Sequence, residues 1–364
     1  MLQPRSSTAV PMTFVPLVDA MKSVTHVITL VATLSLAAPS AFAAQEAVYE
    51  TSVAAQPDED VASDCRYELT LPDSAQTIRA TWVIFERGRD IQQIYRDAEV
   101  RAFARRNHLA LLYPFHCAAK AYRDMDIDPF SGLGRGLLVA LRQFADKSKH
   151  RELTTTKLIL LGFSGTGSLV GRFAAYAPER VIAVIATDPG HFDPLGVDTI
   201  NLSPHAAAIP QLILVGSADA ISGTQRPYAY FRKYFDRGSP WTFVVQNKTP
   251  HCCIINAKSL ILDWLDAVLI HPASRHAGWH GFIATAPSDT MDCPTPFPPA
   301  SPVWCRGTRD SWNEANWSVS NAKVERRRDA PTGMIPAGWL PSRKFATEWK
   351  AFVRLPEHPV TSLP

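Results

Sequence analysis

Between Arg79 and Ile270 the sequence alternates short, wholly apolar segments with segments whose apolar residues recur at helical spacing. The apolar segments read RATWVIFERG, LALLYPF, KLILLG, VIAVIAT, PQLILVG and WTFVVQ. Strands that are apolar on both faces are typical of parallel sheets covered by helices on both sides. We therefore predict an α/β fold: a mostly parallel, doubly wound sheet of six βα units in one domain, residues 65–270. One of its helices is expected over residues 94–109.

The N-terminal 43 residues have the pattern of an export signal. Residues 21–43, MKSVTHVITLVATLSLAAPSAFA, carry a lysine, then an apolar run, then small residues that end in Ala-Phe-Ala. These are the three regions of a secretory signal peptide, and the apolar run is too short for a stable membrane span. We predict a translation start at Met21, cleavage after Ala43 and a secreted or periplasmic protein. The polar, acidic residues 44–64 are expected to form a flexible leader.

The C-terminal segment, residues 271–364, differs in composition from the predicted sheet domain. It is rich in proline and holds six of the nine tryptophans. Disordered tails are poor in aromatic residues. We therefore expect an ordered extension that packs on the sheet domain, either as a structural cover or as a lid over the substrate site.

The overall composition excludes several classes of partner. The formal net charge of +3 gives no electrostatic footprint for nucleic acid or an anionic membrane. With 46% apolar residues, the chain has ample material for one large core. No C-x-x-C pair is present and the histidines stand at no ligand spacing, so we predict that no metal is bound. Nothing in the sequence predicts the oligomeric state.

Six cysteines suggest up to three disulfides in an oxidising compartment, with the pairing left open. They are Cys65, Cys117, Cys252, Cys253, Cys293 and Cys305. Cys293 and Cys305 would close a short proline-rich loop in the C-terminal segment. A link from Cys252 or Cys253 to Cys117 or Cys65 would steady the loop that contains His251.

A glycine-rich turn in TKLILLGFSGTGSLVGRF, residues 156–173, joins an apolar strand to a helix. One interpretation is a dinucleotide site, since Gly165 and Gly167 precede Gly171 and Asp188 follows at the end of the next strand. The spacing G-x-G-x-x-x-G departs from the fingerprint, however, and an exported enzyme has little nicotinamide cofactor to use. We therefore expect no cofactor.

The other interpretation is that Ser164 is a nucleophile, which requires a base and an acid later in the chain. Asp219 follows the strand LILVG, and His251 follows the strand WTFVVQ. The carboxyl ends of parallel strands meet at one edge of a sheet, so these side chains should converge with Ser164. Asp188 is the alternative acid, and His191 could line the pocket. The order Ser, Asp, His favours the nucleophile.

At these residues the sequence resembles the α/β-hydrolase superfamily, over about residues 79–270. GFSGTG at 162–167 matches the nucleophile elbow, GSAD at 216–219 the acid loop and TPHCC at 249–253 the histidine loop. The pattern G-x-S-x-G has Thr166 in place of its last glycine, which should make the turn tighter. The resemblance implies an oxyanion hole formed by the backbone N–H groups of Gly165 and, in the loop ERGRD, of Arg87.

These features predict a secreted serine hydrolase that acts on carboxylic esters, including polymer-borne ones, with catalytic residues Ser164, Asp219 and His251. It would be similar to feruloyl esterases and polyester depolymerases. A serine peptidase of the same fold is one alternative. A non-catalytic exported binding protein on a hydrolase fold is another, and a nucleotide-binding oxidoreductase comes third.

Overall fold

The computed structural model describes residues 46–74, 76–120, 128–190, 200–270, 282–286, 323–326, 335–355 and 358. All of these residues lie in the unit Ala44–Pro364. The predicted signal peptide, Cys293, Cys305 and His191 lie outside the described residues.

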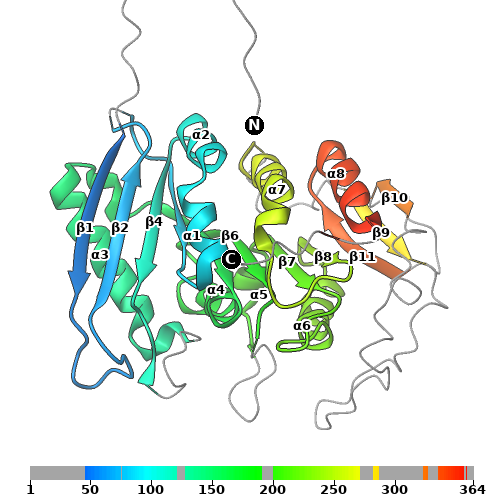
Figure 1. Ribbon diagram of the computed structural model, residues 1–364, viewed down its shortest axis with the longest axis horizontal. Coiled ribbons are helices and arrows are strands. Elements are labelled where there is room, and N and C mark those ends of the chain that lie inside the picture. Colours follow the sequence, from blue (N-terminus) through cyan, green and yellow to red (C-terminus); the bar gives the residue numbers. More distant parts are fainter. Residues whose placement is uncertain are drawn as a thin grey trace, which may run out of the picture. The chain divides into compact units, whose positions relative to one another are not determined.

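An eight-stranded sheet forms the centre of the structure, in the order β1-β2-β4-β3-β5-β6-β7-β8 (Figure 1). Strands β3 to β8 are parallel, while β1 and β2 run antiparallel at one edge. The prediction of a mostly parallel sheet is confirmed. The strands are β1 (Ala47–Val53), β2 (Cys65–Leu71), β3 (Ala80–Ile84), β4 (Leu109–Phe115), β5 (Lys157–Phe163), β6 (Val181–Thr187), β7 (Gln211–Gly216) and β8 (Trp241–Gln246).

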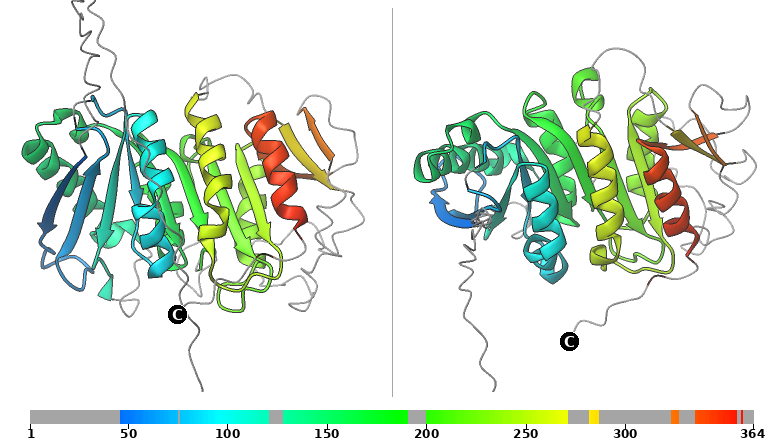
Figure 2. Two further views of the ribbon diagram at one scale, coloured as in Figure 1. Left: turned by 45° about the horizontal axis from the view of Figure 1, so that its top comes forward. Right: turned by 90° about the horizontal axis from the view of Figure 1, so that it is seen from above.

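Helices cover both faces of this sheet, as the buried strands require. Helices α1, α2, α7 and α8 lie on one face, and α3, α4 and α6 on the other (Figure 2). Strands β3, β7 and β8 are buried at every position, because each has helices above and below it. The helices are α1 (Gly88–Arg96), α2 (Ala98–Arg106), α3 (Leu133–Ser148), α4 (Gly165–Tyr176), α5 (Pro204–Ala207), α6 (Gln225–Phe235), α7 (Lys258–Ile270) and α8 (Arg343–Arg354).

The prediction of a flexible leader over residues 44–64 is wrong for β1. Ala47–Val53 pairs with β2 along its whole length, from Ala47 opposite Leu71 to Val53 opposite Cys65. Its side chains alternate between more and less exposed positions, as in an edge strand with one face on the protein. The charged residues around this strand obscure the alternation in the sequence.

The single helix predicted over residues 94–109 is two helices. Asp97 separates α1 from α2, and its carboxylate accepts hydrogen bonds from the backbone N–H groups of Glu99 and Val100. An aspartate whose carboxylate accepts from the first-turn N–H groups in this way begins a new helix.

The described part of the C-terminal extension packs on the sheet domain, as predicted. Strands β10 (Lys323–Arg326), β9 (Phe282–Ala286) and β11 (Ile335–Leu340) form a separate three-stranded sheet. The indole N–H of Trp349, which is fully buried in α8, donates to the Phe243 carbonyl oxygen of β8 at 3.1 Å. The Thr242 hydroxyl donates to the carbonyl oxygen of Trp339. The extension therefore covers the β8 end of the domain.

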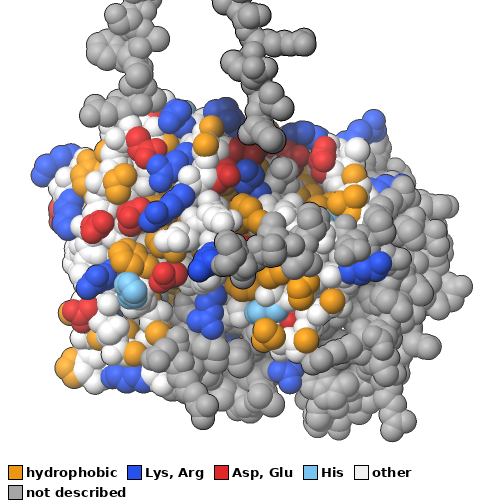
Figure 3. Space-filling model, viewed as in Figure 1, with side chains coloured by type: hydrophobic (Ala, Val, Ile, Leu, Met, Phe, Trp, Pro, Cys, Tyr) orange, Lys and Arg blue, Asp and Glu red, His pale blue; other side chains and the backbone are white. Residues whose placement is uncertain are grey.

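The surface shows no large field of one charge on the face viewed in Figure 3. Lysine and arginine side chains are interspersed there with aspartate and glutamate, and hydrophobic side chains lie between them. Among the described helices, none has the length and apolar character needed to cross a membrane.

Candidate active site

Ser164 occupies a strained turn between β5 and α4. Its backbone has φ 56° and ψ −118°, a positive-φ conformation that residues with a side chain rarely adopt. Two hydrogen bonds to the segment after β6 hold it: the Ser164 N–H donates to the Thr187 oxygen at 2.9 Å, and the Gly190 N–H donates to the Ser164 oxygen at 3.3 Å. This turn is the predicted elbow, and it lifts the serine out of both flanking elements.

Glycine is required at the entrance to the elbow. A Cβ on Gly162 would lie 2.2 Å from the Thr166 oxygen, a separation that no relaxation of a side chain could relieve. A Cβ on Gly167 would lie 3.0 Å from the Thr187 oxygen, a milder conflict. The close approach of β5 to the first turn of α4 therefore depends on Gly162 above all.

Thr166, the departure from the usual elbow pattern, ties the turn together. Its side chain is fully buried. The hydroxyl donates to the Phe163 oxygen at 2.8 Å and accepts from the Phe163 N–H at 2.9 Å. Both backbone polar groups of the residue before Ser164 are thereby satisfied by one side chain, which a glycine could not do.

Replacing this hydroxyl should destabilise the protein. We expect Thr166→Val to lower the free energy of unfolding by about 1–2 kcal/mol, because the partly buried Phe163 N–H loses its acceptor and the Phe163 oxygen its donor. Urea unfolding measures this loss. Thr166→Ser, which keeps the hydroxyl, is the control and should retain most of the stability. Equal stability of the valine variant and the wild type would contradict this role for Thr166.

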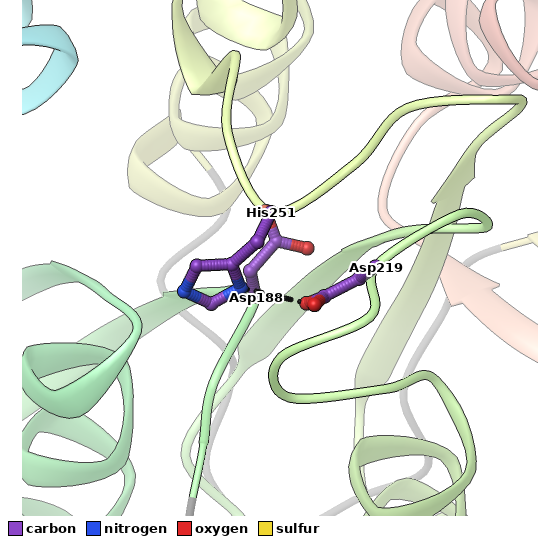
Figure 4. Close-up of side chains that lie close together, drawn as sticks. All are labelled: Asp188, Asp219 and His251. Carbon is purple, nitrogen blue, oxygen red and sulfur yellow. Dashed lines mark hydrogen bonds and ion pairs between the residues drawn. The ribbon is translucent and has the colours of Figure 1, made fainter.

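His251 and Asp219 form a hydrogen-bonded pair at the same edge of the sheet (Figure 4). The imidazole Nδ1 lies 2.8 Å from Asp219 Oδ2. The other carboxylate oxygen of Asp219 accepts from the N–H groups of Ile221 at 2.7 Å and Ser222 at 2.9 Å. The Asp219 side chain is fully buried, while that of His251 is 10% exposed. With Nδ1 directed at Asp219, Nε2 is the nitrogen left for chemistry.

Asp219 is held in its charged form. Burial would raise the pKa of this carboxyl, but the hydrogen bond and charge of His251 and the two backbone N–H groups outweigh burial and lower the pKa below its ordinary value. A permanent carboxylate at Nδ1 fixes the tautomer of the imidazole and stabilises the imidazolium form.

The pair packs directly against the elbow. The Phe163 ring, next to Ser164 in the chain, lies with its centroid 4.8 Å from that of the His251 imidazole. The acid strand and the histidine loop also touch through backbone: the Ala218 N–H donates to the Thr249 oxygen at 3.0 Å. The structure thus brings the elbow, Asp219 and His251 together at the carboxyl edge of the sheet, where the sequence predicted them.

The two predicted oxyanion donors lie just after two neighbouring strands, Gly165 after β5 and Arg87 after β3. Gly165 is the first residue of α4, so its N–H has no carbonyl one turn earlier within the helix and lies at the positive end of the helix dipole. Arg87 immediately precedes α1, after β3, which pairs with β5. Glu86 accepts from the His116 N–H at 3.0 Å. The roles of Gly165 and Arg87 stay predictions.

The loop after His251 contains a disulfide that the sequence analysis did not predict. Cys252 and Cys253 are joined to each other. The proposed link to Cys65 or Cys117 is therefore wrong: those two cysteines lie beside the Tyr67 hydroxyl, whose pKa is raised by burial.

Asp90 anchors this loop from the first turn of α1. Its carboxylate oxygen accepts the Cys253 N–H at 2.9 Å, and Cys253 is buried with φ 69°. Helix α1, which Arg87 immediately precedes, is thereby hydrogen-bonded to the loop that follows His251. Asp90 was missed because an aspartate in the first turn of a helix usually serves only the helix itself.

Removing this anchor should slow the reaction proposed below. We expect Asp90→Ala to lower kcat about 10-fold, because the freed loop displaces His251 and a 1 Å misplacement can cost about 100-fold. Asp90→Asn keeps an acceptor oxygen and should stay within about twofold of the wild type. Steady-state kinetics of both variants measure this difference. Equal kcat values for the two variants would show that the Asp90 hydrogen bond does not position His251.

Asp188, the alternative acid, does not bond His251 Nδ1. It is fully buried and accepts the Gly216 N–H at 2.7 Å, so it is not available to a ribose hydroxyl either. Asp188, Asp219 and His251 are the one group of described residues close enough to ligate a metal. In that group His251 Nδ1 and the Asp219 carboxylate already form a hydrogen bond with each other.

The arrangement decides the fold type, because a serine elbow follows β5, an acid loop follows β7 and a histidine loop follows β8 of a mostly parallel sheet. The chain has the α/β-hydrolase fold. No protein-family model and no curated protein matches its sequence.

Several solved structures of hydrolases are similar to this α/β-hydrolase fold. A ferulic acid esterase is 14% identical, with 62% of this chain matching 99% of that chain at a TM-score of 0.44. An S-formylglutathione hydrolase from Agrobacterium tumefaciens is 16% identical (65% and 97%, TM-score 0.42). A Bacteroides ovatus protein described as a dipeptidyl aminopeptidase IV is 10% identical (62% and 36%, TM-score 0.44), so this chain spans little more than a third of it. Such distant similarities assign neither a reaction nor a substrate.

Proposed function

We propose that this protein is a serine hydrolase that cleaves carboxylic esters through Ser164, His251 and Asp219. The observation that carries the proposal is the pairing of a strained elbow serine, φ 56°, with an imidazole–carboxylate pair packed on the neighbouring Phe163 ring. Strain of this kind persists where the surrounding structure holds a functional group in place.

The reaction follows from the placement of these groups. The Ser164 hydroxyl oxygen attacks the ester carbonyl carbon, and His251 Nε2 takes the hydroxyl proton. The Gly165 and Arg87 N–H groups bind the resulting oxyanion, and each such donor contributes about 3–4 kcal/mol in comparable sites. The C–O bond to the alcohol then breaks, and the imidazolium returns the proton to the alcohol. Water, activated by the same imidazole, releases the acid from the acyl-enzyme.

Export is a further part of the proposal. The signal-like pattern of residues 21–43 supports a secreted or periplasmic location. A disulfide beside the catalytic histidine suits an oxidising compartment, since disulfides seldom persist in the cytoplasm. An exported esterase meets substrates from outside the cell, such as polymer-borne or other environmental esters.

Pre-steady-state hydrolysis of p-nitrophenyl esters tests the reaction. An acyl-enzyme mechanism predicts a burst of p-nitrophenolate equal to the enzyme concentration, followed by a slower steady state. A matching p-nitroanilide should be cleaved far more slowly if the protein is an esterase and comparably if it is a peptidase. A folded protein that binds these esters without turnover would instead be a non-catalytic binding protein.

A further inference from the structure

Asp188 connects the serine elbow with the acid strand. It follows β6 directly and adopts φ 40°, an uncommon conformation for a residue with a side chain. Its N–H donates to the Leu214 oxygen of β7 at 2.7 Å, and its Oδ1 accepts from the Gly216 N–H, also at 2.7 Å. The preceding residue, Thr187, accepts the Ser164 N–H. Asp188 thus stands between the nucleophile and the strand that leads to Asp219.

A carboxyl oxygen of Asp188 lies close to the catalytic pair. Asp188 is fully buried, and its Oδ2 has no hydrogen-bond partner. One oxygen of Asp188, one of Asp219 and a ring nitrogen of His251 all lie within 4.8 Å of one another. Figure 4 shows the three side chains converging, with Asp188 beside the imidazole. A buried polar atom with no partner in a folded protein requires an explanation, and a functional role is one.

Charge determines which form Asp188 takes in this position. The titratable groups that face it are Asp219, from the loop after β7, and His251, from the loop after β8. Burial raises the pKa of Asp188 well above its ordinary value and the charge of Asp219 raises it further, while the Gly216 N–H opposes both. Two buried carboxyl groups this close favour a shared proton, and the raised pKa of Asp188 beside the lowered pKa of Asp219 places that proton on Asp188. A protonated carboxyl can donate a hydrogen bond, which a carboxylate cannot.

We propose that Asp188 is a positioning residue for the catalytic pair: its protonated carboxyl donates to the Asp219 carboxylate, directly or through one water, and it can replace Asp219 as the carboxylate that orients His251. This inference rests on the proposed function. The separation of at most 4.8 Å is within the reach of one bridging water. When Asp219 is neutral, only burial still favours the proton on Asp188, and the imidazolium that forms as Ser164 attacks opposes it.

A cycle of three isosteric variants tests the proposal. Asp188→Asn keeps an acceptor for Gly216 and a donor toward Asp219, so it should lower kcat far less than Asp219→Asn does. Asp→Asn in a Ser-His-Asp triad usually lowers kcat about 10,000-fold. Here we expect Asp219→Asn to lose no more than about 100-fold, with activity that recovers as pH rises and Asp188 ionises, and the double variant to show the full loss. Thermal unfolding confirms that each variant is folded.

Two results of the cycle would overturn the proposal. If Asp219→Asn is as inactive as the double variant, Asp188 cannot substitute. If Asp188→Asn alone costs as much as Asp219→Asn, Asp188 is the ionised acid rather than a neutral donor. Labelling of wild-type Ser164 by a fluorophosphonate precedes the cycle, and its absence would reject the proposed function itself.

A stability measurement tests the protonation of Asp188 whether or not the protein is a hydrolase. Its folded pKa is raised, so the folded state binds more protons than the unfolded state above the unfolded pKa of about 3.9. The stability that this proton supplies is fully present below that pH and is lost as pH rises through the folded pKa. Wild type should therefore lose stability relative to Asp188→Asn as pH rises above about 4, in urea unfolding measured at intervals of about one pH unit. A constant difference would show that Asp188 is ionised throughout.

Discussion

Ser164→Ala is expected to lower kcat for ester hydrolysis about a million-fold, to the rate that oxyanion binding alone supports. Among the described residues Ser164 is the one hydroxyl residue with a positive φ, while the Ser222 hydroxyl lies 3.4 Å from His251 Nδ1, the nitrogen that faces Asp219. The stability of the variant should change little, because alanine keeps the Cβ and loses only the hydroxyl. Kinetics with p-nitrophenyl esters and urea unfolding of the same preparation measure both quantities.

Ser168→Ala is the matched control for this experiment. Ser168 lies one turn further along α4, is fully buried, and its hydroxyl has no hydrogen-bond partner. We expect its kcat to equal that of the wild type. Retention of activity by Ser164→Ala, or an equal loss in both variants, would show that the elbow serine is not the nucleophile.

Gly216→Ala is expected to cause the largest structural effect at the site. A Cβ at this position would lie 2.3 Å from the Thr249 oxygen and 2.8 Å from the Pro250 oxygen, both backbone atoms of the histidine loop. The loop must move away, and the 2.8 Å contact between His251 and Asp219 opens. We expect a loss of about 2–3 kcal/mol of stability from overpacking and about a 100-fold lower kcat from misplacement of the base.

The control for this substitution is Gly338→Ala. Gly338 lies in β11, and a Cβ there meets its nearest atom at 3.4 Å, an ordinary contact. Urea unfolding and steady-state kinetics should find this variant close to the wild type. A Gly216→Ala protein with unchanged stability and kcat would mean that the histidine loop is not fixed by its contact with β7.

The parallel part of the fold could be predicted because each strand from β3 to β8 is an uninterrupted apolar segment. Strands β1 and β2 were missed for the opposite reason. Edge strands bury one face only, and in Ala47–Val53 partly buried positions alternate with exposed ones. The break at Asp97 was missed because helical periodicity continues across it, although aspartate is a strong helix-starting residue.

The candidate triad could be predicted because the carboxyl ends of parallel strands lie at the same edge of the sheet for any conformation of the loops. Contacts that depend on loop conformation could not be predicted from the sequence. Asp90 reaches the Cys253 N–H across a large separation in sequence, and no local pattern announces it. Asp188 was considered as an alternative acid, but only the coordinates show that it accepts the Gly216 N–H while Asp219 bonds His251 Nδ1.

The most direct test of the central claim is to locate the adduct of a fluorophosphonate on the purified, folded protein. Mass spectrometry of a digest identifies the modified peptide. The proposed mechanism predicts a single phosphonyl group on Ser164, absent from Ser164→Ala and strongly reduced in His251→Ala, whose serine lacks a base. A folded protein that remains unmodified, or one modified at another residue, would contradict the assignment of Ser164 as an activated nucleophile.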